Sequence, residues 1–196
     1  RRGRIESGGN QDISAHARVS DKEFATFDVQ GHRGQITDET LQVLEAIWTE
    51  DEASFHGEHY DFDGLAVYPK PAQKPRPKFW IGGRSEAARR RAVDFGEGWI
   101  PSQISADRFR DGAAWMRSYA DERERPMPAD LGVNIFAALA ASDGEADQYM
   151  ADGFGSRFNE EGLETLVISG GLDTFIRKTR RFVDAGVNVF DLKFVP

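Results

Sequence analysis

After residue 77, short continuous apolar runs alternate with longer stretches in which apolar residues recur at helical spacing. The runs predict buried strands at 78–83, 98–102, 131–142 and 187–196. The helical spacing predicts helices at 85–96, 105–126 and 171–186, and the segments 144–154 and 159–170 are helical or mixed. This alternation is typical of a parallel sheet buried on both faces, either a doubly wound sheet or a (β/α)8 barrel.

Polar residues and glycines mark the expected ends of the helices. Ser85 and Asp173 are typical N-caps of the helices that they precede or begin. Gly96 and Gly186 are typical of helix ends, where a left-handed residue closes the last turn. These positions set the bounds that we expect for two of the three amphipathic helices.

The part before residue 78 has a different pattern. "TDETLQVLEAIWTED" (37–51) predicts a helix with Thr37 as its N-cap. Residues 54–78 predict a hairpin that turns at Asp63–Gly64, followed by a proline-rich connector. Residues 1–21 predict irregular structure, with a weak strand signal at 3–7. We expect one domain over residues 1–196, because 196 residues of which 39% are hydrophobic suffice for one core.

Composition narrows the classes of partner. The formal net charge of −8 argues against nucleic acid and anionic membranes, since both require a basic surface. The absence of cysteine excludes disulfides, zinc thiolate sites and thiol catalysis, and it fits a cytoplasmic protein. No apolar run approaches the roughly 20 residues that span a bilayer. The acidic and histidine residues of "HGEHYDFD" (56–63) diverge in an extended run, so we expect no metal site.

The stretch "KFWIGGRSE" carries the clearest candidate chemistry, because it lies where a strand passes into a helix. Gly82 and Gly83 allow a ligand to approach the backbone, and Arg84 offers a fork of donors. Ser85 and Glu86 open the helix, whose free N–H groups attract anions. The stretch therefore indicates a phosphate cradle. The alternative is that the glycines only turn the chain and Ser85 only caps the helix, and the local sequence leaves both open.

Four stretches together resemble the luciferase-like monooxygenase family over about Lys22 to the C-terminus: "QITDETLQVLEAIWTED", "SFHGEHYDFDGLAVYPKPAQKPRPKFWIGG", "AARRRAVDFGEGWIP" and "FVDAGVNVFDLKF". The resemblance implies a (β/α)8 TIM barrel of the bacterial luciferase-like type. It also implies an oxidoreductase or monooxygenase that uses FMN or the deazaflavin coenzyme F420 on a small organic substrate. A separate flavin reductase and a homodimer are further expectations of this kind.

The same resemblance assigns roles to residues. It places the cofactor phosphate over Gly82, Gly83, Arg84 and Ser85, with Glu86 at the helix start. It places Trp99, Ile100 and Pro101 near the ring system or the ribityl chain.

The front of the chain departs from the family pattern. A complete barrel needs about 250 residues, and the weak strand at 3–7 would be roughly the fourth. The barrel is thus expected to be incomplete at the N-terminus, and the catalytic residues would lie in the missing strands. A fragment, a degenerate relative and a barrel completed by a partner chain all remain possible explanations. Open strand edges favour pairing with another chain or with further residues. The alternative function is a non-catalytic flavin-binding or assembly protein that keeps only the rear of the barrel.

Overall fold

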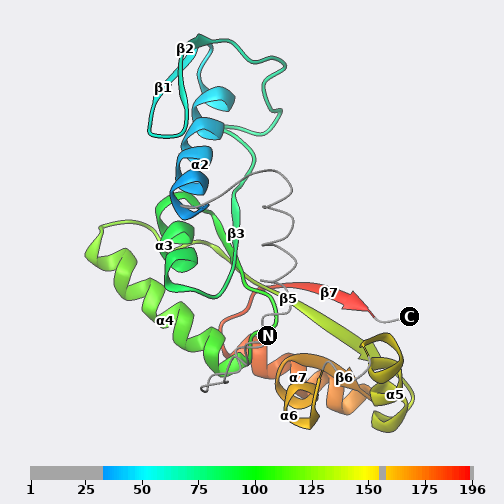
Figure 1. The fold of residues 1–196 in the computed structure, drawn as a ribbon. Helices are drawn as coiled ribbons and strands as arrows, with labels where there is room; N and C mark the ends of the chain where they lie inside the picture. Colours follow the sequence, from blue (N-terminus) through cyan, green and yellow to red (C-terminus); the bar gives the residue numbers. More distant parts are fainter. Residues whose placement is uncertain (1–32, 155–157, 195–196) are drawn as a thin grey trace, which may run out of the picture.

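The computed structural model describes residues 33–154 and 158–194 (Figure 1). Within them a five-stranded sheet consists of β3 (Trp80–Gly82), β4 (Gly98–Ile100), β5 (Asp130–Leu139), β6 (Val167–Gly170) and β7 (Val189–Phe194). All of its pairings are parallel. The helices are α2 (Arg33–Thr49), α3 (Glu86–Phe95), α4 (Ala106–Glu122), α5 (Asp143–Phe154), α6 (Glu160–Thr165) and α7 (Leu172–Asp184). The predicted alternation of strands and helices is confirmed.

The long strand β5 organises the sheet. Its residue Phe136 pairs with both Val167 of β6 and Lys193 of β7, so these two strands lie on opposite edges of β5. Strand β4 pairs with the beginning of β5, and β3 pairs with β4. Because every pairing is parallel, all carboxyl ends point to the same edge of the sheet, which is where ligands bind in such folds.

One face of the sheet packs against α3, α4 and α7, which lie to the left of and below the strands in Figure 1. Its core is formed by fully buried side chains such as Trp99, Phe109, Met116 and Ile135. The alternate side chains Trp80, Ile100 and Asn134 are only partly buried, and we call their side the inner face. A sheet with these three helices on one face fits part of a barrel wall, whereas a doubly wound sheet is covered on both faces.

The α5 helix packs against β5 and β6, and α6 packs against β6. They form a second apolar cluster that contains Ala138, Ala146, Met150 and Val167. The α2 helix packs on the main core through Leu41, Leu44 and Trp48. The antiparallel hairpin of β1 (Ala53–His56) and β2 (Asp61–Leu65) lies beside it at the top of Figure 1.

Three predicted helix ends are wrong. Thr37 lies inside α2, which begins at Arg33. Asp173 lies in the first turn of α7, whose N-cap is Gly171. Gly96 has an extended backbone with a φ of −100° rather than a left-handed one. Glycine is needed there because a Cβ would lie 2.9 Å from the Ala92 carbonyl oxygen. Gly186 is left-handed as predicted, with a φ of 100°.

The hairpin is confirmed, but its turn is not at Asp63–Gly64, because both residues lie in β2. The loop joins His56 to Asp61, and it is held by the Glu39 carboxylate, which accepts the backbone N–H groups of Glu58 and His59 at 3.0 and 2.8 Å. The proline-rich connector then leads to β3. The predicted irregular segment 1–21 and the weak strand at 3–7 lie outside the described residues.

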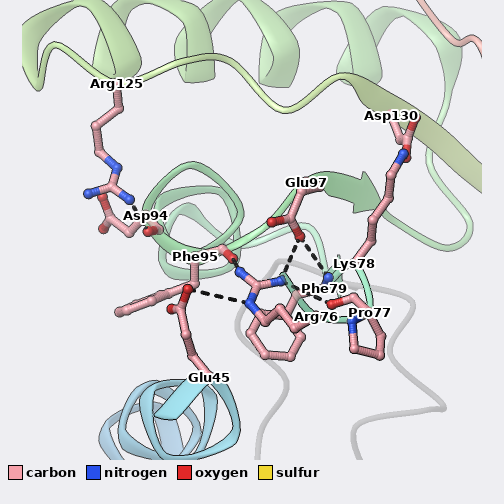
Figure 2. A network of polar contacts seen from close by, with 10 residues as sticks. All are labelled: Glu45, Arg76, Pro77, Lys78, Phe79, Asp94, Phe95, Glu97, Arg125 and Asp130. Atoms are coloured by element: carbon pink, nitrogen blue, oxygen red, sulfur yellow. Dashed lines mark hydrogen bonds and ion pairs between the residues drawn. The ribbon is translucent and has the colours of Figure 1, made fainter. Parts of the chain in front are cut away.

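A polar network fixes the connector at the amino-terminal edge of the sheet (Figure 2). The buried guanidinium of Arg76 donates to the Pro77 carbonyl oxygen at 3.0 Å and to Glu97 Oε2 at 3.1 Å. It also lies 3.9 Å above the Phe79 ring. The same Glu97 oxygen accepts the Phe79 N–H at 2.8 Å. Such contacts at the edge opposite the carboxyl ends stabilise the fold rather than serve ligands.

Candidate functional site

The glycine turn after β3 has the geometry of an anion cradle. Gly83 has a φ of 99°, in the left-handed region that only glycine adopts readily. A Cβ on Gly82 would have the Ile100 carbonyl oxygen as its nearest neighbour at 3.8 Å, so a ligand can approach this backbone closely. Both glycines are exposed. The turn thus combines an unusual backbone with open space.

The N-terminus of α3 lies directly behind this turn. Ser85 is its N-cap, as predicted, and its hydroxyl accepts the Ala88 N–H at 3.2 Å. Among the described residues, the N–H groups of Glu86 and Ala87 have no hydrogen-bond partner. The Glu86 carboxylate points along the helix to Arg90, 2.6 Å away. Free N–H groups and the helix dipole therefore remain available to an anion.

Arg84 ties this turn to the loop that follows β4. Its Nη1 donates to the Gln103 carbonyl oxygen at 2.9 Å. Among the described residues, this is the only hydrogen bond of the guanidinium. The remaining donors of the fork can bind a phosphate oxygen without losing the bond to Gln103.

The three residues predicted near the ring system occupy different layers. Trp99 is fully buried, stacks on Phe109 with ring centroids 4.9 Å apart, and donates from Nε1 to the Gly83 carbonyl oxygen at 2.9 Å. Its indole therefore faces α4 and reaches the cradle through that single hydrogen bond. Pro101 is also fully buried. Ile100 is the one of the three whose side chain lies on the inner face, beside Gly132.

The inner face next to the cradle holds an exposed aromatic ring. Trp80 lies across the neighbouring strands, because a Cβ on Gly98 would come within 3.0 Å of its indole and one on Gly132 within 3.3 Å. Farther along, the Asn134 amide donates to the Asp191 carboxylate. This apolar ring and the polar pair leave a mixed surface, which the sequence reasoning did not identify.

A second turn of the same kind is closed by the protein itself. β6 passes through Gly170 and Gly171 into α7, again as strand, two glycines and helix. Here the Asp143 carboxylate accepts the Gly171 N–H at 2.7 Å and the Thr174 hydroxyl at 2.9 Å. The Gly171 N–H bond, followed by the Thr174 bond, lowers the pKa of Asp143 from its ordinary range. An internal anion thus occupies the second cradle, which leaves the first for a ligand.

Within the described ranges, no group of three histidine or acidic residues could hold a metal ion. The expectation that the side chains of 56–63 diverge is wrong, because the hairpin brings its two strands together. His56 lies 2.7 Å from Asp61 and 3.2 Å from Asp63. The hydrogen bond to Asp61, and then the charge of Asp63, raise the pKa of His56. None of the helices described is both long and apolar enough to span a bilayer.

Comparison with known proteins identifies a matching family and similar curated proteins. The family model described as luciferase-like monooxygenase matches residues 17–166. The FMNH(2)-dependent dimethylsulfone monooxygenase of Pseudomonas putida is 31% identical over 137 residues, which are 64% of this chain and 37% of that protein. Its counterpart in Pseudomonas fluorescens is 28% identical over 115 residues, 59% of this chain and 30% of that protein. The chain therefore spans only about a third of the curated relatives' length.

Solved structures share the fold at low identity. The coenzyme F420-dependent tetrahydromethanopterin reductase of Methanopyrus kandleri gives a TM-score of 0.70 at 14% identity, covering 83% of this chain and 58% of that one. A long-chain alkane monooxygenase gives 0.68 at 16%, covering 89% and 55%. The fold is therefore the α/β luciferase-like barrel, of which this chain forms a part.

Proposed function

The chain belongs to the luciferase-like monooxygenase family, and on that premise we propose that it binds FMN and takes part in the oxidation of a small organic substrate. The observation that carries the proposal is the open cradle formed by Gly82, Gly83, Arg84 and the start of α3. It offers two N–H groups without partners and a guanidinium with unused donors beside an exposed turn. These groups fit a phosphate dianion.

The choice between FMN and F420 rests on the relatives. Those at 31% and 28% identity bear names that specify FMNH(2), whereas the F420-dependent structures are 14% and 16% identical. Both coenzymes carry a phosphate on the ribityl chain, and the same cradle would hold it. The greater sequence similarity favours FMN.

Each part of the described site has a role in this proposal. The cradle binds the phosphate, and Trp99 holds the turn in shape through the Gly83 carbonyl. Ile100 and Trp80 form the apolar part of the inner face, against which the flavin ring would lie. When bound, reduced FMN would supply the electrons that activate oxygen for transfer of one atom to the substrate. We assign the residues that contact the substrate to further strands, which would complete the barrel.

The proposal extends to partners and location. A separate flavin reductase would deliver the reduced FMN. A second copy of the chain, or another chain, would cover the edges of β3 and β7 that have no partner strand within the described residues, because unpaired parallel edges invite further pairing. The absence of cysteine is consistent with a location in the cytoplasm.

A titration with FMN and F420, followed by fluorescence, tests the proposal. Arg84→Ala should weaken FMN binding by about 1.5–3 kcal/mol, the contribution of a hydrogen bond to a charged group. Arg110→Ala is the matched control, because Arg110 is an exposed arginine that pairs with Asp107 on its own helix. Unchanged FMN affinity in Arg84→Ala would remove this residue from the site. Tighter binding of F420 than of FMN would reverse the choice of cofactor.

Turnover tests the catalytic half of the proposal. The chain should be supplied with reduced FMN, oxygen and dimethyl sulfone or related small molecules, and product should be measured. FMN binding without turnover on any substrate would favour the non-catalytic flavin-binding or assembly protein.

A further inference from the structure

Gln103 combines two unfavourable features in one residue. Its φ is 51°, in the left-handed region that a residue with a side chain rarely adopts. Its side chain is nearly excluded from solvent, with 7% of the residue exposed, and the buried amide nitrogen Nε2 has no hydrogen-bond partner among residues 33–154 and 158–194. A buried unpaired donor and a strained backbone each destabilise a protein. Their coincidence indicates that Gln103 has a function beyond the fold.

The surrounding contacts hold the residue in this conformation. Gln103 N–H donates to the Asn134 carbonyl oxygen at 3.3 Å, and its own carbonyl accepts Arg84 Nη1 at 2.9 Å. The preceding Ser102 forms a parallel bridge with Asn134. The backbone is thus fixed to β5 on one side and to the cradle on the other. Fixing a side chain in advance reduces the cost of ordering it when a ligand binds.

The position of Gln103 identifies the ligand group. The residue lies three positions after the carboxyl end of β4, at the edge where the cradle opens, and it contacts the arginine of the cradle directly. We propose that the Gln103 amide is a further ligand of the cofactor phosphate, donating from Nε2 to one of its oxygens. This inference rests on the proposed function. A bound phosphate would supply the acceptor that the amide lacks, so binding would remove the penalty that the ligand-free protein carries.

The inference predicts opposite signs for stability and binding. Gln103→Leu replaces the amide and its unpaired donor with an apolar side chain, so the ligand-free protein should melt at the same or a higher temperature. The same variant should bind FMN about tenfold more weakly, as expected for the loss of one hydrogen bond to a charged group. Riboflavin, which has no phosphate, should bind the variant and the wild type equally. Gln148→Leu, on the exposed face of α5, is the matched control and should change neither quantity.

The experiment compares thermal unfolding without ligand and titrations with FMN and with riboflavin for the three proteins. Loss of affinity for FMN alone, without loss of stability, would support the inference. Equal weakening of FMN and riboflavin would overturn it, because the amide would then contact the ring or the ribityl chain. A lower melting temperature with unchanged FMN affinity would also overturn it and assign Gln103 to the fold.

The same measurements distinguish a failure of the proposed function from a failure of this inference. If the wild type binds neither FMN nor F420, the cradle assignment and the phosphate role of Gln103 are both refuted. If the wild type binds FMN and the Gln103→Leu variant binds it with the same affinity, the cradle assignment stands and this inference is refuted.

Discussion

Replacing Trp99 with phenylalanine tests whether the buried layer behind the cradle controls ligand binding. The indole is fully buried between the sheet and α4, and its Nε1 is the group that holds the Gly83 carbonyl oxygen at 2.9 Å. Phenylalanine keeps an aromatic ring beside Phe109 but has no donor. The variant therefore separates packing from the hydrogen bond that shapes the turn.

The expected magnitude follows from these contacts. Losing the hydrogen bond costs about 1 kcal/mol, and the smaller ring leaves a void that costs about 1–2 kcal/mol. For a domain of this size, a total of about 2–3 kcal/mol lowers the melting temperature by roughly 5–10 °C. In addition, the Gly83 turn loses its anchor, so the cradle N–H groups are less well aligned. We expect about tenfold weaker FMN binding, equivalent to one hydrogen bond to a charged group.

Thermal unfolding followed by circular dichroism and FMN titration at a temperature where the variant is folded measure the two effects. Trp115→Phe is the matched control, because this indole stacks on Tyr119 at 5.3 Å and has no contact with the cradle. It should lose some stability and keep its FMN affinity. If Trp99→Phe binds FMN as tightly as the wild type, Trp99 has a packing role only, and the link between the buried layer and the cradle is refuted.

Three further substitutions probe the fold around the site. Gly112→Ala would place a Cβ 2.7 Å from the Trp99 indole, so overpacking of about 1–3 kcal/mol should exceed the gain of about 1 kcal/mol in helix propensity and lower the melting temperature. The control Gly144→Ala, whose Cβ would have no atom within 4 Å, should not destabilise the protein. Equal melting temperatures for the two variants would refute the clash. Arg76→Met should reduce the free energy of unfolding in urea by about 2 kcal/mol through loss of its buried ion pairs without changing FMN affinity. Asp143→Asn should lower the melting temperature more at pH 7 than at pH 3. Hydrogen bonds hold the folded pKa of Asp143 below its ordinary 3.8, so the contribution of the carboxylate is fully present above that value and is lost as the pH falls through the folded pKa. Equal effects at both pH values would contradict this.

Local signals predicted the strand, the glycine turn and the helix start at residues 80–86. Ser85 was identifiable as an N-cap because a capping side chain bonds within its own first turn, here to Ala88. The strand before Gly82 was identifiable from its short apolar run, and Gly186 from its place after an amphipathic helix. These features depend on neighbours a few residues away, so the order of residues alone contains them.

Features that depend on distant contacts were missed. The N-cap of α7 is Gly171 rather than the nearby Asp173, and its N–H is held by Asp143, 28 residues earlier in the chain. The hairpin turn is fixed by Glu39, 19 residues before Glu58. Gln103 could have been noticed as a polar residue just after a strand, at the edge where ligands bind. Its left-handed backbone and its buried amide arise from bonds with Asn134 and Arg84, and no local pattern signals them.

The two glycine turns show why a motif alone does not locate an anion site. Both consist of a strand, two glycines and a helix N-terminus, and both end at the carboxyl edge of the same sheet. At Gly171 the protein's own Asp143 carboxylate accepts the N–H of the N-cap residue and the Thr174 hydroxyl, so an external anion would meet a charge that is already bound there. At Gly83 the adjacent residue is instead a cation, Arg84, whose bond to the Gln103 carbonyl leaves part of its fork unused. The sign of the charge at each turn is set by a distant residue in one case and by the adjacent residue in the other, and on the proposed function only the Gly83 turn would hold the cofactor phosphate.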